Sequence, residues 1–378
     1  MKKQFGQFFT KNSDYILQGF GKYIESKKIT DPFAGNKDLI NWAKKHKAKQ
    51  CVGFDIDRKL VNNKNIFYND SVNNIRKYKF VLTNPPYLHK NKADTKTKKI
   101  FFTGNNKNYE DLYQTSINSI LNSSEGILIV PLNFLSASNS KNIRDQFFNR
   151  FKIVQLNIFT ERVFEDTTYN VISFYFNRSK NDLTKNQFTA LILPDKRKIR
   201  VKLEKKYNWQ FGGKFIKDTM CVKNRLGIYR LTEKDIDEGN IPIDLAIQDM
   251  KFKKRFKISK DVFEKLKQNI IILRAIDSKK GKKICLEDIR EYGINGIVGK
   301  STSRTLAHII FNNNISLEDQ EKIIDLFNKM LNDYREEYFS LFLTNFRDQN
   351  RKRISFDFAY KLINKIYYGQ IKKQPTLF

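Results

Sequence analysis

The stretch KFVLTNPPY, residues 79–87, joins a short apolar run to an amide, two prolines and an aromatic ring. The run has the length and composition of a buried β-strand. The two prolines fix their own backbone and favour extended conformations in the residues before them, so the chain that leaves the strand at Asn84 is stiff. This ending predicts a rigid site at the carboxyl end of the strand rather than an ordinary turn.

Similar apolar runs recur along the first half of the chain, and helix-compatible segments separate several of them. Near-continuous apolar strands that alternate with helices are typical of a parallel, doubly wound sheet that is buried on both faces. We therefore predict an α/β fold with a Rossmann-like, mostly parallel sheet of seven strands, in which the last two runs form a hairpin. The seven runs cover residues 28–33, 50–56, 65–69, 79–84, 126–132, 152–159 and 170–176, and the helical segments cover 37–48, 108–122 and 140–150.

The second half of the chain has a different character. Residues 177–187 are polar without periodicity and predict a linker. Two helical patterns close the chain, from Leu317 to about Phe342 and from Phe356 to about Tyr367, with Ser316 and Ser355 as candidate N-caps. We predict two domains, residues 1–180 and residues 187–378, the second of mixed α+β type. Dense basic runs mark this second half, at 196–206, 251–257 and 278–283.

Charge is the most unusual feature of the composition. The chain has 71 Lys and Arg against 40 Asp and Glu, a net charge of +31. Such an excess favours a polyanionic partner, because each cation that neutralises a phosphate releases a counterion. The three cysteines are scattered and indicate neither a disulfide framework nor a zinc site. No long apolar segment predicts a membrane helix, so we expect a cytoplasmic protein that does not associate with membranes.

Three acids follow successive predicted strands. In a doubly wound sheet, ligands bind beyond the carboxyl ends of the strands. Asp31 opens DPFAG, in which Gly35 permits a tight turn. Asp55 ends GFDID about 24 residues later, near the spacing at which nucleotide folds place an acid on the ribose hydroxyls. Asp70 follows the next run and is a candidate acceptor for an exocyclic adenine amine, whereas Asp57 is a weaker candidate that could cap a helix.

The stiff ending at Asn84 suits recognition of a planar amine. Its side-chain carbonyl and the backbone carbonyl of Pro85 are two uncharged acceptors for one amino group, and Tyr87 offers a flat face for stacking. Hydrogen bonds to both N–H groups favour a pyramidal nitrogen and restore its lone pair, so positioning can replace a strong base. We therefore do not expect a catalytic histidine. Glutamine, cytosine and adenine amines all fit this description.

At these residues the sequence resembles the S-adenosylmethionine-dependent amino-group DNA methyltransferases, particularly the N6-adenine enzymes of restriction–modification systems. NPPY is similar to their catalytic motif, DPFAG to their cofactor loop and GFDID to their ribose-binding strand. GQFFT, residues 6–10, resembles a further cofactor motif of the class in which the target-recognition domain follows the catalytic domain. The resemblance covers residues 5–178. One departure is Lys37, where many relatives have glycine.

The resemblance implies S-adenosylmethionine as the cofactor and assigns roles to individual residues. Catalysis would depend on Asn84, Pro85, Pro86 and Tyr87, with Tyr87 stacked on a flipped base. The other face of the base would contact Phe164, with Tyr169 as a second candidate. The cofactor would contact Phe8, Thr10, Asp31, Phe33, Gly35, Asp55, Ile56 and Asp70.

The resemblance also implies a partner, duplex DNA, and a biological role, the protective modification activity of a type II restriction–modification system. A restriction endonuclease that acts on the same sequence would be a separate polypeptide. The Lys-rich segment 89–108 would close over DNA as a mobile loop, and Arg274, Arg304 and the basic run 351–353 would contact bases or phosphates.

Four other functions stay open at this point. The same tetrad occurs in glutamine N5 protein methyltransferases, but those enzymes lack a large basic C-terminal half. RNA adenine N6-methylation and DNA N4-cytosine methylation use the same amine chemistry, although the N4-cytosine class usually begins its tetrad with serine. A catalytically inactive nucleic-acid-binding module is the fourth, and the intact tetrad argues against it.

Overall fold

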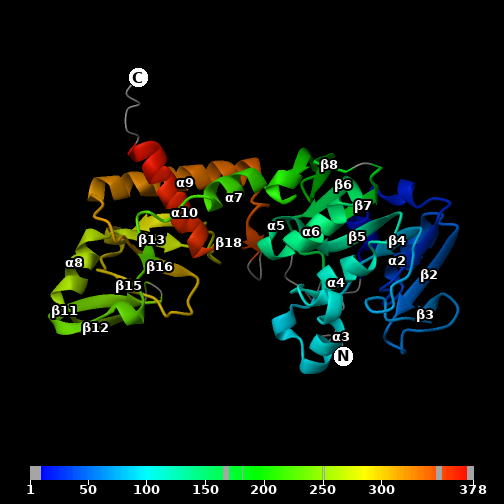
Figure 1. Ribbon diagram of the computed structural model, residues 1–378, viewed down its shortest axis with the longest axis horizontal. Coiled ribbons are helices and arrows are strands. Elements are labelled where there is room, and N and C mark those ends of the chain that lie inside the picture. Colours follow the sequence, from blue (N-terminus) through cyan, green and yellow to red (C-terminus); the bar gives the residue numbers. More distant parts are fainter. Residues whose placement is uncertain are drawn as a thin grey trace, which may run out of the picture. The chain divides into compact units, whose positions relative to one another are not determined.

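The structure is a computed structural model, and it describes residues 10–164, 170–180, 182–248, 250, 252–345 and 351–372. These residues form two compact units, an N-terminal unit that extends to Gly213 and a C-terminal unit that begins at Lys214 (Figure 1). We describe each unit by itself.

A nine-stranded sheet forms the centre of the N-terminal unit, with the strand order β3-β2-β1-β4-β5-β7-β6-β8-β9 (Figure 1). The first five strands in this order are parallel, and β7 is antiparallel to both of its neighbours. Strand β8 is parallel to β6, and β9 is antiparallel to β8. The strands are β1 (Lys28–Asp31), β2 (Gln50–Asp55), β3 (Ile66–Tyr68), β4 (Phe80–Thr83), β5 (Glu125–Pro131), β6 (Phe151–Phe159), β7 (Val171–Arg178), β8 (Lys185–Leu193) and β9 (Arg197–Glu204).

The predicted α/β class is confirmed, and each of the seven predicted runs forms a strand. The predicted hairpin is also present, because β6 and β7 pair antiparallel. The count of seven strands is wrong, since β8 and β9 extend the same sheet. Residues 177–187 therefore include the short connection from β7 to β8 and do not separate two domains. The basic run 196–206 contains β9. From Lys198 onward the charged residues of this strand alternate with apolar ones and so lie on one of its faces.

Helices cover both faces of this sheet. Successive residues of β7 point to opposite faces, and their partners differ accordingly. The ring centroids of Phe174 and Phe176 lie 5.7 and 5.3 Å from that of Phe147 in α6. Tyr175 instead stacks on Tyr23, with ring centroids 3.8 Å apart. The helices of this unit are α1 (Ser13–Ile16), α2 (Asp38–Lys45), α3 (Thr95–Phe101), α4 (Leu112–Ser119), α5 (Asn133–Ser136) and α6 (Lys141–Phe148), and α7 (Gly213–Met220) begins at the boundary.

The C-terminal unit combines small sheets with helices. A four-stranded sheet has the order β10-β16-β13-β14, a three-stranded sheet the order β12-β11-β15, and β17 pairs with β18. Its helices are α8 (Lys260–Gln268), α9 (Leu317–Glu337) and α10 (Phe356–Ile366). The strands are β10 (Tyr229–Arg230), β11 (Glu238–Ile247), β12 (Lys253–Ile258), β13 (Ile271–Arg274), β14 (Cys285–Asp288), β15 (Ile297–Val298), β16 (Leu306–Ile310), β17 (Thr344–Asn345) and β18 (Lys352–Arg353).

Both predicted N-caps of the closing helices are confirmed. The Ser316 hydroxyl accepts from the Asp319 amide, and the Ser355 hydroxyl accepts from the Phe358 amide, each at 3.1 Å. Helix α9 ends at Glu337, five residues before the predicted Phe342. The apolar residues beyond it, Leu341 to Leu343, are buried outside the helix, which explains why they continued the apolar pattern.

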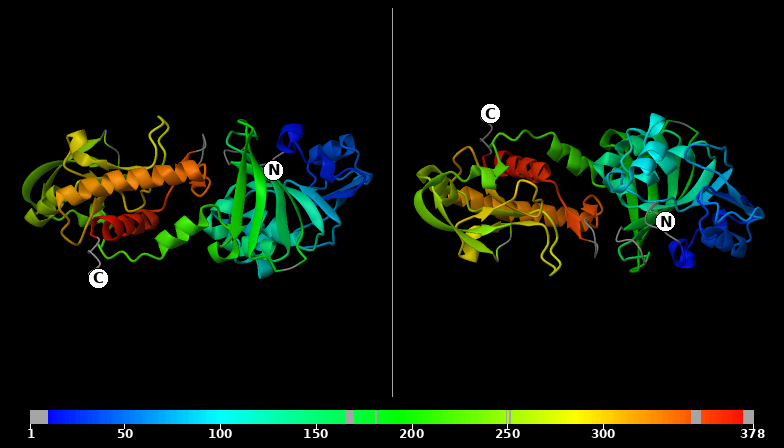
Figure 2. Two further views of the ribbon diagram at one scale, coloured as in Figure 1. Left: turned by 90° about the horizontal axis from the view of Figure 1, so that it is seen from above. Right: turned by 90° about the horizontal axis from the view of Figure 1, so that it is seen from below.

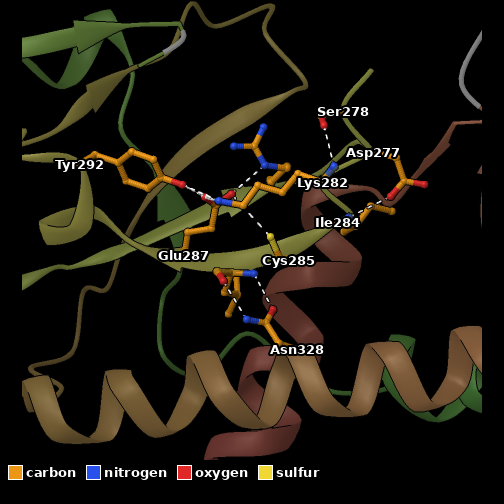
Figure 3. A network of polar contacts seen from close by, with 10 residues as sticks. Asp277, Ser278, Lys282, Ile284, Cys285, Glu287, Tyr292 and Asn328 are labelled. Atoms are coloured by element: carbon orange, nitrogen blue, oxygen red, sulfur yellow. Dashed lines mark hydrogen bonds and ion pairs between the residues drawn. The ribbon is translucent and has the colours of Figure 1, made fainter. Parts of the chain in front are cut away.

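Several cations that we expected to contact DNA are instead bound within the C-terminal unit. Arg274 pairs with the buried Glu287 at 2.7 Å, and Lys282 and Tyr292 converge on the same carboxylate (Figure 3). Lys352 is 4% exposed, and the Arg351 guanidinium donates to the Asp277 carbonyl at 2.6 Å. The expected DNA contact of the Lys352 side chain is therefore wrong, because this side chain is buried. Arg274, Arg351 and Arg353 are half-buried, and their DNA contacts remain predictions. Arg304 is exposed, and its role remains a prediction.

Candidate active site

Four strand ends meet at one edge of the nine-stranded sheet. Because β1, β2, β3 and β4 are parallel neighbours, their carboxyl ends lie together, and one of the predicted polar residues ends or follows each strand. A cleft of about 630 Å³, measured with its solvent-open mouth, lies at this edge. Its lining residues are Pro32, Phe33, Gly35, Asp55, Ile56, Asn69, Asp70, Ser71, Val72, Asn84, Pro86, Phe101 and Leu112.

Asp31, the last residue of β1, is buried beside the cleft. Its Oδ1 accepts from the Thr83 hydroxyl at 2.6 Å and from the Phe33 amide at 3.0 Å, so it ties β1 to β4 and to the following turn. The carboxyl is 1% exposed, and burial raises its pKa to about 7 even though these two hydrogen bonds act in the opposite direction. Asp31 thus changes charge near neutral pH.

Asp55, at the end of β2, lines the cleft and is joined to the turn that follows β1. Its Oδ2 accepts from the Gly35 amide at 2.9 Å, and its Oδ1 accepts from the Asp57 amide at 2.8 Å. Burial raises the pKa of Asp55, and these amides oppose that shift. Gly35 has φ +49°, a left-handed conformation that glycine adopts without steric cost. The turn therefore brings its backbone against the carboxylate.

Lys37 stands where many members of the family that the sequence resembles have glycine. It also has a left-handed backbone, with φ +70°. It is the N-cap of α2, and its side chain makes no capping bond. The turn thus keeps the conformation that glycine would favour although the residue is lysine. A residue with a β-carbon is strained in this conformation.

Asp70 follows β3 and lines the cleft. Its Oδ1 accepts from the amides of Val72 and Asn73 at 3.1 and 3.2 Å. The neighbouring Asn69 is buried, and its side-chain amide donates to the Ser71 hydroxyl at 3.0 Å. Asn69 and Ser71 line the cleft with Asp70 but were not predicted, because isolated small polar residues carry no distinctive pattern in a sequence.

Apolar side chains form the cleft wall that the sequence analysis missed. Phe101 and Leu112 are 4% and 1% exposed, and they pack with Val72, Ala93 and Phe102, against which Phe33 and Ile56 also lie. Phe101 ends α3, within the segment 89–108 that we expected to be a mobile loop. The segment is not a loop throughout, since it contains a helix that Asp94 caps through the Thr97 amide at 2.7 Å, and its closure over DNA remains a prediction. The many lysines of this segment made it look like an exposed loop, although its apolar residues pack against the rest of the unit.

Asn84 lines the cleft, and both atoms of its amide group have partners. Its Nδ2 donates to the Thr10 hydroxyl at 3.1 Å, and its Oδ1 is an acceptor for the Tyr87 hydroxyl. That hydroxyl has a second acceptor, the Ile129 carbonyl, at 2.9 Å. The Tyr87 ring is 5% exposed and lies edge-on to Tyr113, with ring centroids 6.4 Å apart. The structure thus brings Asn84 and Pro86 to the cleft and buries Pro85 and Tyr87 behind it.

Two of the remaining predicted residues, Thr10 and Phe164, are described by the structure, and two are not. Thr10 is 3% exposed and reaches the site through Asn84, whereas Phe164 is buried after β6 and does not line the cleft. Phe8 and Tyr169 lie outside the described residues.

Within the described part of the chain, no cluster of three or more His, Cys, Asp or Glu is arranged to hold a metal ion. No described helix has the length and apolarity needed to cross a membrane.

Residues 7–164 match the family model described as Eco57I restriction-modification methylase. The matched region contains all four strand ends of the cleft and the apolar wall, and it ends before β7. No curated protein matches the chain.

Several solved structures are similar to part of the chain. One is a modification subunit of a putative type I restriction enzyme from Vibrio vulnificus YJ016, with 13% identity, a TM-score of 0.38, and coverage of 51% of this chain and 48% of that chain. The type I restriction enzyme EcoKI M protein has 15% identity, a TM-score of 0.36, and coverage of 49% and 48%. The type IIG restriction endonuclease BpuSI has 15% identity, a TM-score of 0.42, and coverage of 64% and 37%. The similarity thus spans about half the length of the first two proteins and a smaller part of BpuSI.

Proposed function

We propose that this chain is a DNA methyltransferase that transfers a methyl group from S-adenosylmethionine to the exocyclic N6 amine of a flipped adenine in duplex DNA. Its biological role would be the protective modification activity of a type II restriction–modification system. The observation that carries the proposal is the convergence of Asn84, Asp55 and Asp70 on one cleft at the carboxyl edge of parallel strands. The family match of residues 7–164 supports the same class of reaction.

The chemistry of the cleft fits S-adenosylmethionine. This cofactor has a ribose diol and an adenine ring, and the cleft offers a carboxylate, Asp55, together with the apolar surfaces of Ile56, Phe101 and Leu112. Asp70 would accept from the adenine amine, and the Phe33–Gly35 turn with Asp31 would hold the amino-acid portion. When bound, the cofactor supplies the electrophilic methyl carbon.

Asn84 would position the target amine. A side-chain carbonyl oxygen has two lone pairs, so its Oδ1 can accept from an amine in addition to the Tyr87 hydroxyl. The Thr10 hydroxyl fixes the orientation of the amide by accepting from its Nδ2. The prolines that follow hold the backbone. The carbonyl of Pro85 would be the second acceptor, which requires it to become accessible, because Pro85 is buried and does not line the cleft. The target base would have to leave the duplex, at a cost of a few kcal/mol.

The strongest competing function is methylation of another planar amine, because Asn84 alone does not distinguish adenine from cytosine or glutamine. The decisive measurement is the identity of the product. Incubation of the protein with duplex DNA and methyl-labelled S-adenosylmethionine, followed by digestion to nucleosides, is expected to yield N6-methyladenine. Label found only in N4-methylcytosine, RNA or protein would refute the proposal in favour of the corresponding alternative.

The role of Asn84 has its own test. Asn84→Ala is expected to lower the rate of methyl transfer at least about 100-fold, the effect of removing one positioned polar group from an active site. Cofactor affinity should change little, because the other polar contacts of the cleft remain. Asn41→Ala, an exposed position on α2, is the matched control. Near-normal turnover of Asn84→Ala in single-turnover assays would contradict the role of this residue.

A further inference from the structure

Strand β9, at one edge of the N-terminal sheet, carries a row of exposed cations. Lys198, Arg200 and Lys202 are exposed and alternate with apolar residues along the strand. Because alternate residues of a strand share a face and each residue adds about 3.3 Å, neighbouring cations of this row are about 7 Å apart. We call these three residues the β9 row.

A rigid base supports the β9 row. On the opposite face of the same hairpin, Phe188 of β8 pairs with Val201 of β9, and both are buried. Leu203 is 1% exposed on that face. The row therefore belongs to a strand that packs on the core of the unit, and its cations do not depend on a loop for their position. The β8 and β9 strands belong to the green part of the chain in Figure 2.

Acidic groups are scarce around the β9 row. The β8 residues opposite the three cations are Leu191, Thr189 and Gln187. Lys202 has one ion pair, with Glu204 at 3.6 Å, and Glu204 also contacts Lys206 at 3.8 Å. Within the described residues, no ion pair engages Lys198 or Arg200. An exposed ion pair contributes little free energy, so Lys202 can exchange Glu204 for another anion at little cost.

The topology of the sheet relates the row to the candidate active site. Strand β7 is antiparallel to β5 and to β6, and β8 is parallel to β6, so β8 points in the same direction as β5 and β4. The turn from β8 to β9 therefore lies at the edge of the sheet where the cleft lies, and β9 runs away from that edge. This turn contains Asp195 and Lys196.

We propose that the β9 row binds the phosphate backbone of the duplex DNA that carries the target adenine, several strands away from the cleft. Cations at regular spacing on one rigid face suit a regular array of phosphates, and a row of charges on an edge strand opposes the addition of a protein strand. The inference rests on the proposed function for its DNA partner. It goes beyond the family match, because β9 lies outside residues 7–164.

The test is the salt dependence of DNA binding by the full chain. Each phosphate contact contributes about 0.9 to the slope of log K against log salt concentration. The triple variant Lys198→Gln, Arg200→Gln, Lys202→Gln should lower that slope by about 2 to 3. The control triple variant Lys44→Gln, Lys45→Gln, Lys47→Gln removes the same charge from exposed positions near the end of α2 and should leave the slope within about 1 of the original.

Two further variants keep the test decisive. The double variant Lys198→Arg, Lys202→Arg keeps the charge and should keep the slope. If the triple variant does not fold, as judged by its thermal melting, the single variant Arg200→Gln should lower the slope by about 1. An unchanged slope, or equal losses in the β9 row and control variants, would overturn the proposal.

The same experiment separates this proposal from the proposed function. DNA affinity is measured without cofactor, and product formation is measured in a separate nucleoside analysis. Formation of N6-methyladenine with a slope that does not depend on the row would overturn only the role of the row. A slope that depends on the row, without any N6-methyladenine, would overturn only the proposed reaction.

Discussion

At the scale of single residues, Asp31 couples the charge of the site to the stability of the fold. Burial raises its pKa from 3.8 to about 7, so the fold favours the protonated carboxyl. The stability that it contributes is complete below its unfolded pKa and is lost as the pH rises through about 7. Asp31→Asn keeps the acceptor oxygen but cannot ionise.

We therefore expect Asp31→Asn to be more stable than the original protein at pH 8, by up to about 4 kcal/mol, and nearly equal to it at pH 4. Urea denaturation at the two pH values measures the difference. Asp14→Asn is the control, because that carboxylate is exposed, with 60% side-chain accessibility, and pairs with Lys45. Equal effects of the two substitutions at pH 8 would show that burial of Asp31 is not the cause.

Substitution of Lys37 tests whether the turn between β1 and α2 is strained. A left-handed backbone costs a residue with a β-carbon about 1–2 kcal/mol, and glycine avoids this cost but loses more chain entropy on folding. Lys37→Gly is therefore expected to raise the free energy of unfolding by up to about 1 kcal/mol. Lys44→Gly, within α2, should lower it by about 1 kcal/mol. Destabilisation by both substitutions would argue against strain at Lys37.

At the scale of elements, α3 supplies one wall of the cleft through Phe101. A buried aromatic side chain contributes about 2–3 kcal/mol of apolar contact, equivalent to roughly 30- to 150-fold in affinity. Phe101→Ala is expected to weaken S-adenosylmethionine binding to about that extent, as measured by calorimetry on the folded variant. The control is Phe102→Ala, in the same apolar cluster but not in the cleft lining. It should lower stability with a smaller effect on affinity.

At the scale of the whole molecule, the net charge of +31 predicts strongly salt-dependent binding to duplex DNA. A protein that makes 6–10 phosphate contacts loses about 10³- to 10⁵-fold in affinity between 50 and 200 mM salt. We expect a loss of at least about 100-fold over that range, measured by fluorescence anisotropy. Affinity for the cofactor should change only a few-fold, because its cleft is mainly apolar and acidic. Similar salt dependence of both affinities would contradict this distinction.

Much of the N-terminal unit could be predicted from the sequence, because its signals are local. Each apolar run records the burial of one strand, and the polar residues that follow the runs come together as soon as the strands are parallel. This reasoning brought Asp55, Asp70 and Asn84 to one site. It also identified the caps Ser316 and Ser355, since a cap is defined by its immediate neighbours.

The tertiary structure decided the features that depend on contacts between distant residues. Phe101 and Leu112 became cleft walls only through their packing on Val72. Likewise, only the folded chain pairs Arg274 with Glu287 and buries Lys352. The sequence by itself therefore determined the strands, the polar residue at the end of each strand, and the polar edge of the site that these residues form. The fold decided what encloses that edge and which charges stay exposed, because burial depends on residues that no local pattern contains.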